Sequence, residues 1–426
     1  MIATNTVFSG LSSYQTVDNE IIQKTTYFNS KRFRTSQDIC LGRFLYIFCV
    51  NCDRISIDMS DIFIDWQIDN TIFGETEKME PYYYSQMSKQ QQRIYQAIKN
   101  GLESLSQSFD VQRIDGTELS DIFYRLRLDC PEIFYASTFR YSFYNDSTLI
   151  KIKPVYLFEK NKIREHQLAM RARVEKLARV AKDKSDWEKE QYIHDFICEN
   201  VTYDKLKKQY SHEILGPLGQ GVGVCEGIAK SVKILCDQLS IPCIVVISEN
   251  NPDKNIKYRH AWNVIKINGS WYHLDATFDN SLGKKEVRYD YYNLDDKSIF
   301  KDHEPVIYKI PVCSEGDHFY YKEKKLSFTK QEDVARRCQQ AIKKGKVLTF
   351  HWRGGYLTKT VLEELLHSIA EAAKEKSRHC QVSVNWLQAV IRVKFIQGQI
   401  ENSVKMDDAY EEENDAALGV IENNYL

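Results

Sequence analysis

Apolar residues recur at helical spacing in two segments of the first third of the chain. The positions are Ile94, Ile98, Leu102 and Leu105 in the first segment and Leu119, Ile122, Phe123 and Leu126 in the second. This spacing places the side chains on one face of an α-helix, so each segment is predicted to be helical. The second helix is expected to end at Asp129-Cys130-Pro131, because proline disfavours helix in the residue before it.

The pattern then changes to that of a β-hairpin followed by two helices. The predicted elements are strands at 139–144 and 148–155 around the turn Asn145-Asp146-Ser147, a charged helix at 162–181, and a helix from Ser185 to about Asn200. Ser185 and Glu188 have the spacing of a capping box, in which each side chain satisfies a backbone N–H of the first turn.

The segment after Cys225 has the apolar face of a buried helix. Its inward positions are Ile228, Val232, Leu235, Cys236 and Leu239, and Ile241-Pro242 must end it. Cys225 therefore lies in the first turn, where the helix dipole and free N–H groups favour a negative charge and can stabilise an oxyanion. The alternative is a small core residue, as free cysteines often are. Cys236 and Cys243 are interpreted in that second way.

Three glycines surround Cys225, at positions 221, 223 and 227. Glycine lets a backbone turn sharply and approach another group closely. The glycines are therefore interpreted as leaving space for a ligand beside the cysteine.

A second hairpin is predicted around Asn268-Gly269, which is the strongest short-range signal for a two-residue turn. Ile267 should then pair with Ser270, Trp262 should face Asp275, and His260 should face Thr277. On that register His260 and Asp275 become diagonal neighbours on one face of the sheet, with Cα atoms about 7–8 Å apart. His273 is the rival base on that face, but its expected neighbour is Val264 and no carboxylate is in register.

The last part of the chain reads as a small α/β appendage and an acidic tail. The expected elements are helices at 331–343 and 358–374 and strands at 347–352, 382–386 and 390–396. Residues 401–426 hold eight Asp and Glu against one Lys, and we expect them to be disordered. The predicted division is 1–80 of unclear fold, 81–160 as an α/β lead-in module, 161–325 as the core, 326–400 as the appendage and 401–426 as the tail.

Composition narrows the class of protein. The chain has 426 residues, enough for several domains, and its net charge of −1 gives no reason to expect nucleic acid or an anionic membrane as a partner. Its longest apolar run, Phe44–Val50, is too short to cross a bilayer. The first residues lack a basic region followed by an apolar one, so a signal peptide is not expected. Eleven cysteines without regular spacing predict free thiols in a reducing compartment, so the cytoplasm is expected.

One cysteine pair has the spacing of a metal or redox motif. Cys49 and Cys52 form a single Cys-x-x-Cys, with Cys40 upstream. A structural zinc site needs four ligands, and no second pair lies nearby. These cysteines are interpreted as ordinary buried thiols.

Three strings carry the chemistry. They are Gly-Val-Cys-Glu-Gly-Ile-Ala at 223–229, His-Ala-Trp-Asn at 260–263 and Tyr-His-Leu-Asp-Ala-Thr at 272–277. A thiol attacks a carbonyl as thiolate, so it needs a base, and the base needs a third group that orients it. Cys225, His260 and Asp275 supply these three residue types in settings that suit them.

Together the strings resemble the transglutaminase-like superfamily, a branch of the papain-like cysteine enzymes. The resemblance implies an α+β fold in which a helix with the cysteine at its N-terminus packs on an antiparallel sheet that carries the His and Asp, with flanking domains. It implies that Cys225 is the nucleophile, His260 the general base and acid, and Asp275 the orienting group. The resemblance covers roughly 85–310. The chain is most similar to bacterial transglutaminase-domain proteins, and its strings at 129–134 and 288–293 also resemble theirs.

The chain departs from the family at the second oxyanion donor. Animal transglutaminases place a Trp well before the cysteine, whereas here the nearest upstream candidate is Gln220, which also suits a solvated loop. Trp262, beside the base, is a candidate supporting residue. No calcium-loop spacing of acidic residues is present, so neither a metal nor a cofactor is expected.

The expected reaction is attack of Cys225 on an amide of a protein or peptide substrate, with a thioester intermediate. Water would resolve the thioester in a protease or amidase, and an amine would do so in a transglutaminase. Hydrolysis is favoured, since an amine acceptor in bulk water needs a dedicated site. The alternative is a non-catalytic scaffold, and in either case the C-terminal domain is expected to bind a protein partner.

Overall fold

The computed structural model describes residues 80–254, 256, 259–283 and 286–397, together with the backbone of strands 2–7 and 420–425. Most of the region 1–80, including Cys40, Cys49 and Cys52, lies outside the described residues. So does the predicted acidic tail apart from its strand at 420–425.

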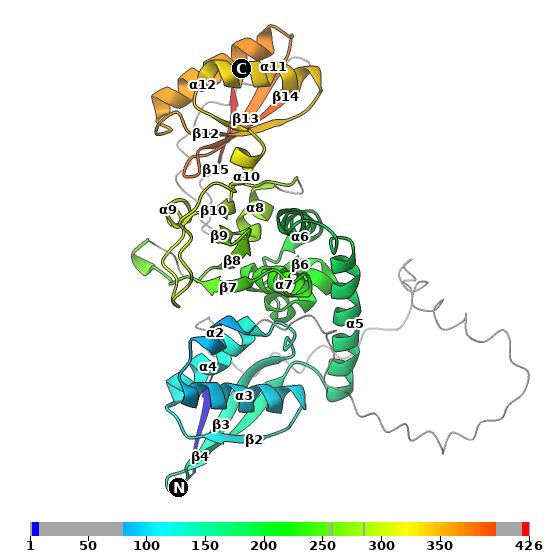
Figure 1. Ribbon diagram of the computed structural model, residues 1–426, viewed down its shortest axis with the longest axis vertical. Coiled ribbons are helices and arrows are strands. Elements are labelled where there is room, and N and C mark those ends of the chain that lie inside the picture. Colours follow the sequence, from blue (N-terminus) through cyan, green and yellow to red (C-terminus); the bar gives the residue numbers. More distant parts are fainter. Residues whose placement is uncertain are drawn as a thin grey trace, which may run out of the picture. The chain divides into compact units, whose positions relative to one another are not determined.

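The first described module is a four-stranded antiparallel sheet with helices packed beside it (Figure 1). Its elements are β1 (Ile2–Val7), α2 (Tyr82–Ser85), α3 (Lys89–Glu103), β2 (Phe109–Gln112), α4 (Gly116–Asp129), β3 (Ala136–Tyr144) and β4 (Leu149–Tyr156). The strand order is β1-β3-β4-β2. The apolar positions that predict α3 and α4 are buried, and α4 ends at Asp129 as the following proline requires.

The central part combines helices with a second antiparallel sheet, in the order β10-β9-β8-β7. Its elements are α5 (Lys160–Arg179), α6 (Asp186–Asn200), β5 (Thr202–Tyr203), η1 (Gln209–His212), η2 (Leu215–Gln220), β6 (Val222–Gly223), α7 (Cys225–Gln238), β7 (Cys243–Ile247), η3 (Pro252–Lys254), β8 (Ala261–Ile267), β9 (Ser270–Leu274), α8 (Ala276–Gly283), β10 (Tyr292–Leu294), α9 (Asp296–Ile299) and α10 (Tyr320–Glu323). The predicted capping box of Ser185 and Glu188 starts α6.

Helix α7 is the centre of this part, because it is buried on nearly every side. It packs against β7, β8, α5 and α6 (Figure 1). The side-chain amide of Asn263 on β8 donates to the carbonyl of Ala229 at 2.9 Å and ties the sheet to the helix. The helix that carries Cys225 is thereby fixed against the strand that follows His260.

The predicted register of the second hairpin holds, but the strand ends earlier than expected. Ile267 pairs with Ser270 and Val264 with His273, up to the pair Asn263–Leu274. The expected pairs Trp262–Asp275 and His260–Thr277 do not form, because the Asp275 carboxylate accepts the backbone N–H groups of Thr277 and Phe278 and starts helix α8. His260 and Asp275 therefore flank the sheet instead of lying within it, which corrects the expectation that the sheet itself carries them.

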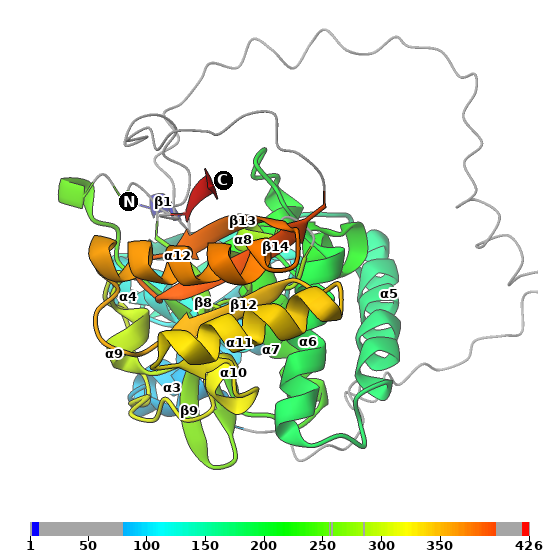
Figure 2. The same cartoon turned by 90° about the horizontal axis from the view of Figure 1, so that it is seen from above.

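The C-terminal part is a five-stranded sheet in the order β11-β12-β14-β13-β15, with its own apolar core. Figure 2 shows α11 and α12 side by side. The elements are β11 (Ser327–Phe328), α11 (Gln331–Lys343), β12 (Leu348–Trp352), α12 (Lys359–Lys374), β13 (His379–Asn385), β14 (Val390–Ile396) and β15 (Val420–Tyr425). The five elements predicted here from sequence are present, with boundaries shifted by a few residues.

Gly227, the second residue after Cys225, allows a close approach of the chain to itself. A Cβ atom on Gly227 would lie 2.2 Å from the carbonyl oxygen of Ser211, which already accepts the N–H of Val224. This glycine therefore makes room for the chain's own loop before α7, and not for a ligand as the sequence suggested.

Gly227→Ala should lower the free energy of unfolding, because backbone atoms must move to admit the methyl group. Overpacking of this kind costs about 1–3 kcal/mol. Urea unfolding followed by circular dichroism measures the change. The control is Gly283→Ala at the end of α8, where the nearest atom would be 3.7 Å from the new Cβ and no loss is expected. Equal stability of wild type and Gly227→Ala would show that the loop does not constrain the start of α7.

Candidate active site

Cys225 is the first residue of α7 and differs from the other described cysteines in its exposure. Of the eight cysteines in the described ranges, seven are buried and Cys225 alone is partly exposed. The N-cap residue, Val224, makes no side-chain hydrogen bond to the first turn. Because no side chain caps this helix end, its first N–H groups remain available to a negatively charged atom beside Cys225.

Buried charges fix the start of α7. Glu226 lies 2.8 Å from Lys230 and 3.8 Å from Arg127, and Glu213 in the preceding loop pairs with the same two cations. Burial raises the pKa of Glu226, but Lys230, His212 and Arg127 outweigh it and hold that pKa well below its usual range. Removal of one partner would leave a buried charge uncompensated, so this network holds α4, α7 and the loop together.

His260 lies directly before β8, with a side chain that is 21% exposed. Its backbone N–H donates to Ser248 Oγ at 3.0 Å, and its carbonyl accepts the N–H of Ser248. The ring Nε2 is 2.6 Å from Asp275 Oδ2. This leaves Nδ1 for Cys225, whose proximity raises the pKa of the ring. The structure thus brings together the three residues that the sequence strings single out.

Asp275 is fully buried and is held by both of its oxygens. Oδ1 accepts the N–H groups of Thr277 at 2.8 Å and Phe278 at 3.0 Å, while Oδ2 lies against His260 and, at 2.9 Å, against Nε2 of His303. Burial raises the pKa of this carboxyl. The two histidines lower that pKa by more than burial raises it, so it is well below the usual range. Asp275 is therefore a fixed negative charge beside the imidazole.

The same pairing determines the charge of His260. Burial lowers its pKa, whereas the negative charge of Asp275 and the contact with Cys225 raise it, and the result is a pKa of about 10. The ring is therefore an imidazolium near neutral pH. A positive ring beside a thiol favours the thiolate.

Trp262 and His273 form a buried support behind His260. The indole of Trp262 stacks on the His260 ring, with centroids 5.7 Å apart, and its Nε1–H donates to His273 Nδ1 at 2.9 Å. His273 Nε2 in turn lies 2.8 Å from Asp296 Oδ1. Burial lowers the pKa of His273 despite that carboxylate. His273 is thus a neutral, enclosed residue. The indole N–H of Trp262 donates to it and is not left for another group.

Gln220 is the last residue of η2 and is exposed, five positions before Cys225. Its role as an oxyanion donor stays a prediction. His303, in contrast, touches the site and was missed in the sequence. It follows α9 in a stretch with no recognisable motif, and only its neighbour Asp302 hints at an ionisable pair.

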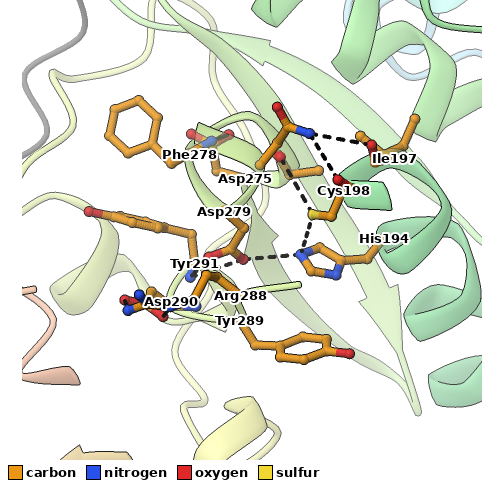
Figure 3. Close-up of polar contacts among 12 residues, drawn as sticks. His194, Ile197, Cys198, Asp275, Phe278, Asp279, Arg288, Tyr289, Asp290 and Tyr291 are labelled. Carbon is orange, nitrogen blue, oxygen red and sulfur yellow. Dashed lines mark hydrogen bonds and ion pairs between the residues drawn. The ribbon is translucent and has the colours of Figure 1, made fainter. Parts of the chain in front are cut away.

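A second set of Cys, His and Asp lies deeper in the same part of the chain. Figure 3 shows His194 between Asp279 and Cys198. Its Nε2 lies 3.1 Å from Asp279 Oδ2 and 3.6 Å from the sulfur of Cys198. His194 and Asp279 have no exposed surface, and Cys198 is 2% exposed. The cluster is thus enclosed within the protein, and its contacts join α6 to α8.

Among the residues that the structure describes, two groups of side chains have a spacing that a metal ion could use. They are His260, Asp275 and His303, and His273, Asp296 and Cys313, with donor atoms within 4.8 Å of one another in each group. In both groups the histidine nitrogens that face the carboxylate already hydrogen-bond to it. A metal would have to replace these bonds.

Comparison with known proteins agrees with the chemistry of the site. Residues 171–276, which include Cys225, His260 and Asp275, match the model of the transglutaminase-like superfamily. A search of curated proteins finds no match. Within the described residues, no helix is long and apolar enough to cross a membrane.

Solved structures similar to this chain are distant. One described as a TGase is 12% identical, with a TM-score of 0.22 over 40% of this chain and 50% of its own. One described as a candidate cysteine protease from Cytophaga hutchinsonii is 18% identical, with a TM-score of 0.23 over 40% and 61%. A candidate protease from Parabacteroides distasonis is 15% identical, with a TM-score of 0.21 over 34% and 37%. The chain thus spans less than two thirds of each.

These structural similarities are weak, whereas the family model covers the three residues of the site directly. It ends one residue after Asp275 and contains the first two strings and all but the last residue of the third. The resemblance of this chain to the transglutaminase-like superfamily is therefore confirmed for residues 171–276.

Proposed function

We propose that this protein is a thiol enzyme that acts on amide bonds of proteins or peptides through a thioester on Cys225. The observation that carries the proposal is the chain of contacts from the partly exposed thiol to the His260 ring and from that ring to the buried Asp275. The Asp275 carboxylate favours a protonated His260 ring, and that positive ring favours a thiolate at Cys225. Together the contacts support a thiolate beside an imidazolium.

In the first step, the Cys225 thiolate attacks the carbonyl carbon and forms a C–S bond while the carbonyl electrons move to oxygen. The free N–H groups at the start of α7 stabilise that oxyanion. Collapse of the intermediate breaks the C–N bond. His260 gives its Nδ1 proton to the leaving amine, and a thioester and a neutral imidazole remain.

In the second step, water attacks the thioester. His260 accepts a proton from the water at Nδ1, the C–S bond breaks, and the acid product leaves with the thiolate and imidazolium restored. Asp275 holds Nε2 throughout, which keeps Nδ1 aimed at the sulfur. An amine in place of water would give transamidation by the same steps, so product analysis with and without an added primary amine distinguishes the two.

The cellular compartment in which the protein acts is also part of the proposal. Seven of the eight described cysteines are buried and unpaired, and a thiolate nucleophile persists where thiols stay reduced. These observations support a cytoplasmic enzyme.

Iodoacetamide should label Cys225 faster than any other thiol at pH 7, because among the cysteines that the structure describes only this one is both accessible and beside an imidazolium. Mass spectrometry of the intact protein and of its peptides measures the rate at each site. Asp275→Asn keeps the shape of the side chain but removes the charge that holds His260 protonated, so labelling should fall at least about tenfold, and turnover of a substrate further.

Cys225→Ala is the control for this experiment and should lose the fast label while it keeps the wild-type unfolding curve. Labelling spread evenly over the accessible thiols of the wild type would instead support the non-catalytic scaffold.

The free energy of unfolding should fall as the pH rises from about 6.5 to 10 through the contribution of His260. The folded protein holds the His260 proton up to a pKa of about 10, whereas the unfolded chain releases it near 6.5. The stabilisation is therefore complete below pH 6.5 and is lost as the pH approaches 10. Urea unfolding between pH 6 and 10 measures the slope.

His260→Gln should reduce that slope by up to about 1.4 kcal/mol per pH unit, the value for one proton. The matched control is His367→Gln, at an exposed position on α12, which should keep the wild-type slope. The same slope in wild type and His260→Gln would contradict the imidazolium assignment.

A further inference from the structure

His303 bridges two carboxylates in the buried space beside Asp275. Its Nε2 lies 2.9 Å from Asp275 Oδ2, and its Nδ1 lies 2.7 Å from Asp302 Oδ1. A carboxylate only accepts, so each ring nitrogen must donate, and an imidazole that donates from both nitrogens carries a positive charge. Burial lowers the pKa of His303, but the two carboxylates outweigh it and raise that pKa.

The surroundings of His303 leave it little freedom to move. Its ring packs against Trp262, Phe278 and Tyr291, with centroids 4.9, 4.6 and 5.6 Å away. The ionisable groups that face it are Asp275, Asp302, His260 and Tyr291. The positive ring of His303 thus lies between two negative groups, and Asp275 is shared by two positive rings.

Asp302 connects this arrangement to the C-terminal domain. Its Oδ2 accepts the hydroxyl of Tyr291 at 2.7 Å and the side-chain amide of Gln388 at 3.1 Å. Gln388 lies in the turn between β13 and β14, is 3% exposed, and also donates to the carbonyl of Ser298 at 3.1 Å. The amide is therefore anchored both to α9 and to the segment that follows it.

The strand residues on either side of that turn are also built into the central part of the chain. Asn385 donates to Asp290 Oδ2 at 3.2 Å, and Val390 is fully buried in the apolar cluster that contains Trp262 and Phe278. A turn that buries both polar and apolar side chains in this way is a structural part of the site and not a surface contact.

We propose that His303 is a positioning residue for Asp275 and that the C-terminal domain sets its position through Gln388 and Asp302. This inference rests on the proposed function, because it concerns the same thiol. The chain of contacts runs from Gln388 through Asp302, His303 and Asp275 to His260 and Cys225. Each bond fixes the direction of the next group, so loss of the first contact loosens the carboxylate that orients the His260 ring.

The test is the second-order rate constant for alkylation of Cys225 by iodoacetamide at pH 7 in the full-length protein. His303→Leu should lower this constant about tenfold or more, because Asp275 loses one of the two groups on Oδ2. His303→Gln retains an amide donor toward Asp275 and should recover to within about threefold of wild type. Recovery by glutamine separates positioning from simple packing.

Two further variants test the role of the C-terminal domain. Gln388→Leu should lower the constant about threefold or more, because the Asp302 carboxylate loses a donor. The control is Gln331→Leu on α11 of the same domain. It breaks an exposed hydrogen bond to Glu364 that does not reach the site, and it should leave the constant unchanged.

A measurement on the wild type covers the case in which His303→Leu fails to fold. Nitrogen-15 NMR of the histidine rings should show both nitrogens of His303 protonated at pH 7, and a neutral tautomer would overturn the bridge. A wild-type rate in His303→Leu would overturn the positioning role, and a wild-type rate in Gln388→Leu would overturn the part played by the domain. The absence of selective labelling at Cys225 in the wild type would instead refute the proposed function.

Discussion

The buried carboxylate of Asp275 is the group on which the rest of the site depends. A charge taken out of water costs on the order of several kcal/mol unless other groups compensate it. Here four donors do so, two backbone N–H groups of α8 and the rings of His260 and His303. They come from three separate segments of the chain. The need to satisfy one carboxylate therefore fixes the start of α8, the approach to β8 and the turn after α9 at the same point.

The sequence predicted those parts of the site that local rules determine. The Asn-Gly turn gave the correct pairing of β8 with β9 up to Asn263–Leu274, and the apolar face after Cys225 gave α7. The register beyond Leu274 was wrong because a helix cap competed with the strand for Asp275. His303 was missed for another reason. Of its two partners, Asp302 is its neighbour in sequence, whereas Asp275 meets it only in the folded chain.

Residue type alone does not identify a reactive centre in this chain. Cys198, His194 and Asp279 have the same three side chains as the candidate site, and Asp279 lies one helical turn after Asp275. What separates the two sets is access, because only Cys225 reaches the surface among the described cysteines. Sequence periodicity does not report this difference, since both cysteines lie on helices with apolar faces. Exposure arises from what packs over each helix end.

The C-terminal domain has its own core, yet it is not separable from the site in physical terms. Gln388 and Val390 are buried against the central part of the chain, and one of them contacts the carboxylate that holds His303. A chain that ended near residue 325 would expose apolar surface around Trp262 and Phe278 and leave Asp302 with one donor fewer. The division that hydrophobic patterning gives at 325/326 therefore marks where one core ends, whereas the hydrogen bonds that position Asp275 continue across it.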